Sequence, residues 1–131
     1  MRILDSSFLV SMFVEDDAHH SKALAILDTD PDETWILPDL ILFEFLTVIR
    51  YNKGVQAARA AYGDLMANKH VQLRHFEPGE QTAILDLFFS SPLSISTADA
   101  AVAYLCKTLG SPALSFDDNL LKVIARQSIR A

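Results

Sequence analysis

Two kinds of hydrophobic pattern alternate along the chain. Short apolar runs, bounded by turn-forming or charged residues, predict β-strands; they lie at residues 2–4, 35–37, 71–73 and 113–116. Longer segments, in which apolar residues recur every three or four positions, predict helices; they lie at residues 6–13, 18–27, 40–52, 55–66, 84–88, 97–109 and 119–126. Residues 128–130 could add a last short strand. This alternation predicts an α/β fold with a parallel β-sheet sandwiched between helices.

Glycines and prolines fall between these segments rather than inside them. Asp39 is a candidate cap for the helix at 40–52, and Gly54 is expected to end that helix. No repeat, low-complexity run or linker divides the chain. We therefore expect a single domain that covers residues 1–131.

Composition narrows the class of protein. Hydrophobic residues make up 50% of the 131 positions and charged residues 21%, which is typical of a globular domain. The one cysteine, Cys106, excludes an internal disulfide and a cysteine-rich zinc site, and it favours a reducing compartment. The most apolar stretch, residues 35–49, is interrupted by Pro38 and Glu44 and is shorter than the roughly 20 residues of a membrane span. We expect a cytoplasmic protein that does not insert into membranes.

The formal net charge of −6 argues against binding of nucleic acid through a basic surface. It remains compatible with a nuclease that works through bound cations, because divalent metal ions would offset the charge of a group of carboxylates.

Two carboxylates lie on helix faces that are otherwise apolar. Glu44 has Leu40 and Ile41 one turn away. It is either at a helix edge that reaches solvent or in a site where a partner or metal ion compensates its charge. Asp99 could be only a helix cap that forms a capping box with Ser96, yet it also begins a stripe of small apolar residues.

Two more carboxylates, Asp5 and Asp117, directly follow predicted strands. Each could simply cap the next helix. Ligands of parallel sheets bind beyond the carboxyl ends of the strands, so both are also expected to share a crevice with Glu44 and Asp99. Such acids would repel one another unless cations bound there, and all-oxygen ligands favour Mg²⁺ or Mn²⁺ over zinc. The histidines show no ligand spacing and are expected to be structural or surface residues: His19, His20, His70 and His75.

The order of these acids resembles the pattern of the PIN-domain family. The matching segments are Ile-Leu-Asp-Ser-Ser at 3–7, Glu44, Asp-Ala-Ala-Val-Ala at 99–103 and Leu-Ser-Phe-Asp at 114–117, so the resemblance spans the whole chain. It implies a metal-dependent ribonuclease with a parallel sheet and an acidic pocket. Stand-alone prokaryotic members of this family are very often VapC-type toxins of type II toxin–antitoxin pairs.

By this resemblance, Asp5, Glu44 and Asp99 would be the core catalytic and metal-binding acids, and Asp117 the more variable fourth. One or two Mg²⁺ or Mn²⁺ ions would be the cofactor. Ser115 would orient the acids by hydrogen bonding. The other implied supporting residues are Ser6, Asn119 and, if the loop register differs by one, Asp118. The family also implies RNA as the substrate, a small antitoxin protein as a partner, and a homodimer.

Substrate binding is harder to predict. Arg50, Lys53 and Arg59 cluster around the turn between two predicted helices and could guide RNA phosphates, although a solvated basic turn is the simpler interpretation. Two alternatives to a nuclease stay open. An inactive PIN-like binding module would keep the acids without cleaving RNA. A receiver-like signalling domain also gathers acids at strand ends, but it needs a Lys after a late strand and would leave Glu44 unexplained.

Overall fold

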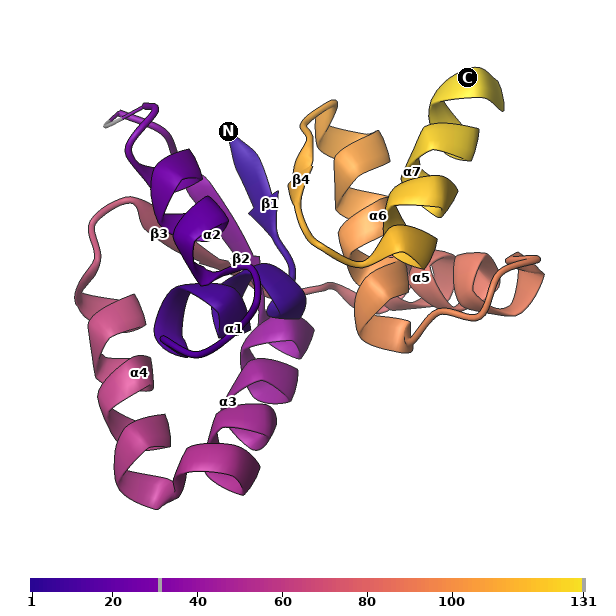
Figure 1. The fold of residues 1–131 in the computed structure, drawn as a ribbon. Helices are drawn as coiled ribbons and strands as arrows, with labels where there is room; N and C mark the ends of the chain where they lie inside the picture. Colours follow the sequence, from indigo (N-terminus) through magenta and orange to yellow (C-terminus); the bar gives the residue numbers. More distant parts are fainter. Residues whose placement is uncertain (31, 131) are drawn as a thin grey trace.

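The computed structural model describes residues 1–30 and 32–130, in which short strands alternate with helices (Figure 1). The strands are β1 (Arg2–Leu4), β2 (Trp35–Pro38), β3 (Val71–Arg74) and β4 (Ala113–Leu114). The helices are α1 (Ser6–Phe13), α2 (His20–Leu27), α3 (Asp39–Lys53), α4 (Val55–Ala67), α5 (Pro78–Ser90), α6 (Thr97–Leu109) and α7 (Asp118–Arg130). The predicted α/β fold, a parallel sheet sandwiched between helices, is confirmed.

All strand pairs of the sheet are parallel, and the strand order is β3-β2-β1-β4. The chain therefore adds β2 and β3 on one side of β1 and then crosses to place β4 on the other side. In the view of Figure 1, α5, α6 and α7 lie on the β4 side, and α1, α2 and the α3–α4 pair on the opposite side. Such a reversal of strand order opens a crevice at the carboxyl ends of the two strands involved. Here those strands are β1 and β4.

Helix α6 is the central helix of the fold. It contacts β1, β4, α3, α5 and α7, and all but one of the residues from Ala98 to Cys106 are buried. A helix with apolar residues on every side needs covering on every side, which the surrounding elements provide. Its ends agree with the prediction because both are encoded locally. Ser96 forms the capping box at the start, and Gly110 takes the left-handed conformation, with φ of 62°, at the end.

The main core joins the sheet to the helices around it. Its fully buried side chains include Leu4, Phe8, Phe45 and Leu105, which come from β1, α1, α3 and α6. Burial raises the pKa of the Cys106 thiol to about 12, so this cysteine behaves as an apolar core residue. Within the described residues, no helix is both long enough and apolar enough to cross a bilayer.

Four details of the predicted elements are wrong. The strand predicted at 113–116 ends at Leu114, because the next backbone N–H groups donate to serine hydroxyls instead of to a neighbouring strand. Residues 128–130 continue α7 and do not form a strand. Helix α5 begins at Pro78, well before the predicted position 84. Asp39 does not cap α3: Pro38 occupies the cap position, and Asp39 is paired with His75 at 3.2 Å.

Candidate functional site

Asp5 is the most deeply buried acid of the predicted site. It follows β1, caps α1 and is 1% exposed. Its Oδ2 accepts hydrogen bonds from the hydroxyls of Ser7 at 2.7 Å and Ser115 at 2.8 Å. Its Oδ1 is buried and has no hydrogen-bond partner in the described structure. A buried carboxylate oxygen without a partner is costly, so this oxygen is a candidate ligand for a bound cation.

The same two serines connect α1 to the segment after β4. The Ser7 hydroxyl accepts from the backbone N–H of Phe116 at 2.9 Å, and the Ser115 hydroxyl accepts from that of Asp117 at 3.0 Å. Each hydroxyl thus donates to Asp5 and accepts from the backbone of the late loop. These hydrogen bonds fix the position of Asp117 relative to Asp5, although the two residues are far apart in the chain.

Asp117 is the acid of the late loop that faces the site. It is half-buried, and its Oδ1 accepts from the backbone N–H of Leu120 at 3.1 Å, at the start of α7. Its neighbour Asp118 is exposed and is not among the residues that line the acidic cleft. Asn119 is also outside the cleft lining, because its side-chain amide donates to the Ser94 carbonyl at 3.1 Å.

Glu44 and Asp99 reach the site from two helices. Glu44, on α3, is half-buried, and its Oε2 accepts from the Ser6 hydroxyl at 2.7 Å. Asp99, on α6, is 9% exposed, and its Oδ2 accepts from the backbone N–H of Ser96 at 3.0 Å as part of the capping box. Helix capping and the proposed site role therefore use different oxygens of the same carboxylate.

These acids line one open cleft of about 400 Å³. Its lining residues are Asp5, Ser6, Ser7, Val10, Ser11, Asp17, His19, Glu44, Ser96, Asp99, Phe116 and Asp117. The pKa of Asp99 is raised to about 6, first by burial and then by the charges of Asp5, Asp117 and Glu44. Asp99 thus lies close enough to the three other acids to feel their charge.

The arrangement of oxygens fits a hard divalent cation. In each of the four carboxylates, one oxygen is held by a hydroxyl or backbone N–H, and the other has no hydrogen bond in the described structure. All-oxygen donors of this kind suit Mg²⁺ or Mn²⁺. Among residues 1–30 and 32–130, no three carboxylate, imidazole or thiol groups already stand close enough together to hold an ion directly.

Some site residues were missed from the sequence, and some predicted ones lie elsewhere. Ser7 and His19 line the cleft; Ser7 lies two residues after Asp5, and His19 was predicted to be structural or on the surface. Arg50 and Arg59 line a separate groove of about 330 Å³ between α3 and α4. Lys53 is 3.5 Å from Asp16 in an exposed ion pair. None of these three cations lines the acidic cleft.

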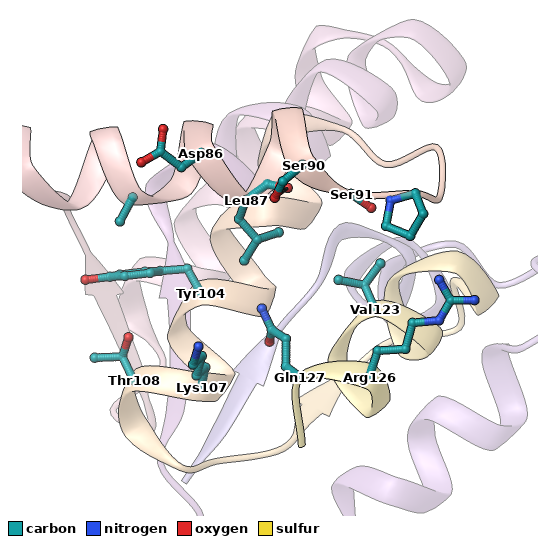
Figure 2. Close-up of a pocket in the computed structure, with 12 residues that line it drawn as sticks. Asp86, Leu87, Ser90, Ser91, Tyr104, Lys107, Thr108, Val123, Arg126 and Gln127 are labelled. Atoms are coloured by element: carbon teal, nitrogen blue, oxygen red, sulfur yellow. Dashed lines mark hydrogen bonds between the residues drawn. The ribbon is translucent and has the colours of Figure 1, made fainter. Parts of the chain in front are cut away.

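A larger cavity, of about 720 Å³, lies between α5, α6 and α7, and none of the predicted site residues lines it (Figure 2). It is lined by Leu87, Tyr104, Val123 and other mainly apolar or hydroxyl side chains, with Lys107 and Arg126 at its sides. Its single acid among the described lining residues is Asp86. Its size exceeds that of the acidic cleft, but its side chains lack a cluster of groups that could perform chemistry.

The fold and the cleft together define an α/β domain whose acids meet at the reversal point of a parallel sheet. The chain belongs to the PIN domain family, whose pattern it matches over residues 2–126. Membership in this family rules out the alternative of a receiver-like signalling domain. No curated protein sequence gives a match to the chain.

Solved structures show the same fold at low sequence identity. The toxin VapC20 of Mycobacterium tuberculosis, described as cleaving the Sarcin-Ricin loop, superimposes with a TM-score of 0.85 at 19% identity, over 93% of this chain and 94% of that one. VapBC2 of Rickettsia felis, solved with a promoter DNA fragment, superimposes with a TM-score of 0.66 at 10% identity, over 93% of this chain and 92% of that one. FitAcB of Neisseria gonorrhoeae superimposes with a TM-score of 0.66 at 14% identity, over 95% of this chain and 94% of that one.

Proposed function

We propose that the chain is a divalent-metal-dependent ribonuclease that hydrolyses RNA phosphodiester bonds. One observation carries this proposal: acids from four separate parts of the chain line one cleft, and each keeps one carboxylate oxygen free of hydrogen bonds. Asp5, Glu44, Asp99 and Asp117 would hold Mg²⁺ or Mn²⁺ there. When bound, such an ion activates water and stabilises the negative charge that develops during phosphodiester hydrolysis.

The residues around the acids serve to hold them in place. Ser7 and Ser115 fix the carboxylate of Asp5, and Ser6 fixes that of Glu44, through hydrogen bonds of 2.7 to 2.8 Å. A carboxylate that is already oriented loses little freedom when it binds a cation or positions a water molecule. Ser6 and Ser115 are therefore proposed as positioning residues, together with Ser7.

The biological role is proposed from the family and the solved relatives. The first of these relatives is described as a toxin that cleaves the Sarcin-Ricin loop. We infer that this chain is likewise the toxin of a type II toxin–antitoxin pair, with a small antitoxin protein as partner, and that it acts in the cytoplasm as a homodimer. Arg50 and Arg59, in the groove between α3 and α4, are proposed to contact RNA phosphates away from the acids.

A cleavage assay with matched variants tests the nuclease. Purified protein is incubated with structured RNAs in Mg²⁺ or Mn²⁺, and the reaction is repeated with EDTA and with Asp5→Asn. Asp86→Asn, in an exposed acid outside the acidic cleft, is the control. We expect cleavage by the wild type and by Asp86→Asn, and none with EDTA or Asp5→Asn. Cleavage that persists in both negative conditions would refute this site.

The inactive PIN-like module gives a different result in the same preparation. Such a protein would bind Mn²⁺, detected by the loss of the paramagnetic resonance signal of the free ion, but would not cleave any RNA supplied.

For the toxin role, growth arrest on expression in the native host is expected, with rescue by the product of a neighbouring small gene. Normal growth despite an active enzyme would contradict that role.

A further inference from the structure

An aromatic stack connects the hydrophobic core to the edge of the acidic cleft. Phe8 of α1 is fully buried and stacks on Phe116, with ring centroids 5.8 Å apart. The His19 imidazole stacks on Phe116 in turn, at 4.4 Å and within 8° of parallel. His19 and Phe116 both line the cleft that contains the acids. His19 is nevertheless exposed, so the part of its ring that Phe116 does not cover is open to solvent.

The backbone on both sides of this stack is held by hydrogen bonds. The Asp17 carboxylate accepts from the backbone N–H of His19 and from the Ser11 hydroxyl, each at 2.9 Å. These contacts hold the pKa of Asp17 below its usual value, with the backbone N–H of His19 as the largest cause. On the other side, Ser7 holds the backbone of Phe116. The imidazole is therefore oriented before any ligand arrives, which limits the entropy lost on binding.

The stack combines an aromatic surface with one nearby positive charge. Lys22 places its ammonium group 5.8 Å from the centre of the Phe116 ring. Proteins bind unpaired nucleotides by combining an aromatic face for the base with a nearby positive charge for the backbone. Of the described residues that line the cleft, only His19 and Phe116 have aromatic side chains. His19 is the more exposed of the two.

We propose that the exposed face of His19 is a stacking surface for an unpaired base of the RNA, next to the acids that would act on its backbone. This inference rests on the proposed ribonuclease function and adds to it a residue that would bind a base of the RNA beside the acids. His19 would then be a substrate-binding residue and would not take part in proton transfer.

The test measures RNA binding separately from cleavage. In an Asp5→Asn background, fluorescence anisotropy follows the binding of a single-stranded RNA of about 12 nucleotides. We expect His19→Ala to weaken binding roughly 5- to 150-fold, the equivalent of one lost base stack. His19→Phe, which keeps a flat ring without ring nitrogens, should bind within a few-fold of the parent. His75→Ala is the control, since His75 is exposed, pairs with Asp39 and does not line the cleft.

RNA variants make the test specific for a base. A scan that replaces single nucleotides by abasic ones should contain a position at which His19→Ala no longer weakens binding. Blunt duplex RNA should bind equally well to His19→Ala and to its parent protein. In the active background, His19→Ala is expected to raise KM and leave kcat within a few-fold of the wild type. Equal melting temperatures verify that both His19 variants are folded.

Two results would overturn the stacking role: unchanged binding in His19→Ala, or a loss in His19→Phe as large as that in His19→Ala. The second result would indicate a hydrogen bond or a charge in place of stacking. Failure of the nuclease proposal is recognised separately, as a wild type that does not cleave RNA with either metal, whatever the binding assay shows.

Discussion

Replacement of Asp99 by Asn tests whether the acidic cleft destabilises the metal-free protein. Asp99 is 9% exposed, and its pKa is raised from 3.8 to about 6 by burial and by the three other acids of the cleft. Asn keeps a side-chain oxygen that can accept from the Ser96 backbone N–H, so the capping box is largely preserved. The substitution therefore removes the charge and little else.

The size of the effect follows from the shift of the pKa. A rise from 3.8 to about 6 corresponds to about 3 kcal/mol of destabilisation of the ionised form in the folded state. Between these two pH values Asp99 binds more protons in the folded protein than in the unfolded chain, so its contribution to the stability falls as the pH rises from about 4 to about 6. Above that range the ionised Asp99 destabilises the folded state by the full amount, and Asp99→Asn removes this destabilisation.

Urea and thermal denaturation in EDTA, from pH 4 to pH 8, measure this difference. At pH 8 we expect Asp99→Asn to be more stable than the wild type by up to about 3 kcal/mol, or roughly 10 °C in Tm. The two proteins should converge near pH 4. Asp86→Asn, an exposed acid outside the cleft, should follow the wild type. A variant that is no more stable than the wild type at pH 8, or a difference that does not depend on pH, would refute the reasoning.

Three further predictions concern other contacts. Ser115→Ala should lower RNA cleavage about tenfold, because Asp5 loses one of its hydroxyl donors, while Ser115→Thr should restore it in the same kinetic assay. Mn²⁺ at about 100 times its Kd should stabilise the wild type by about 2.7 kcal/mol in thermal denaturation and Asp5→Asn by much less. Glu80→Gln should reduce stability at pH 7 by on the order of 1 kcal/mol without changing cleavage. Arg74 lowers the pKa of Glu80 from 4.5 to about 2, so the difference from Glu80→Gln should vanish as the pH falls through that range.

The parts of the fold that local chemistry encodes could be predicted from the sequence. Ser96 and Gly110 mark the two ends of α6, and both ends of that helix were predicted at the observed residues. The position of Asp5 and Asp117 after strands predicted that they would converge, because parallel strands end at the same edge of a sheet. The structure places both in one cleft.

The parts that depend on long-range packing could not be predicted. The Ser7 hydroxyl contacts Asp5 nearby but also the backbone of Phe116, 109 residues away, and no local pattern reveals the second contact. The stack of His19 on Phe116 likewise depends on how the late loop returns to α1. The end of β4 is set by these same serine contacts, which is why its length was overestimated from the apolar run alone.

Two carboxylates of this chain, a half-buried one and a buried one, have opposite electrostatic surroundings. Glu80 is paired with a cation of the chain itself. The Arg74 guanidinium nitrogen Nη2 lies 2.6 Å from Glu80 Oε2, and the pKa of Glu80 falls to about 2. Asp99 has three acids for neighbours, and its pKa rises to about 6. No Lys or Arg is among the described residues that line the acidic cleft, where serine hydroxyls orient the carboxylates without neutralising them. A cluster that served only stability would be expected to resemble the pair of Glu80 and Arg74. An arrangement that orients acids and leaves their charge uncompensated is instead what a site for an external cation requires.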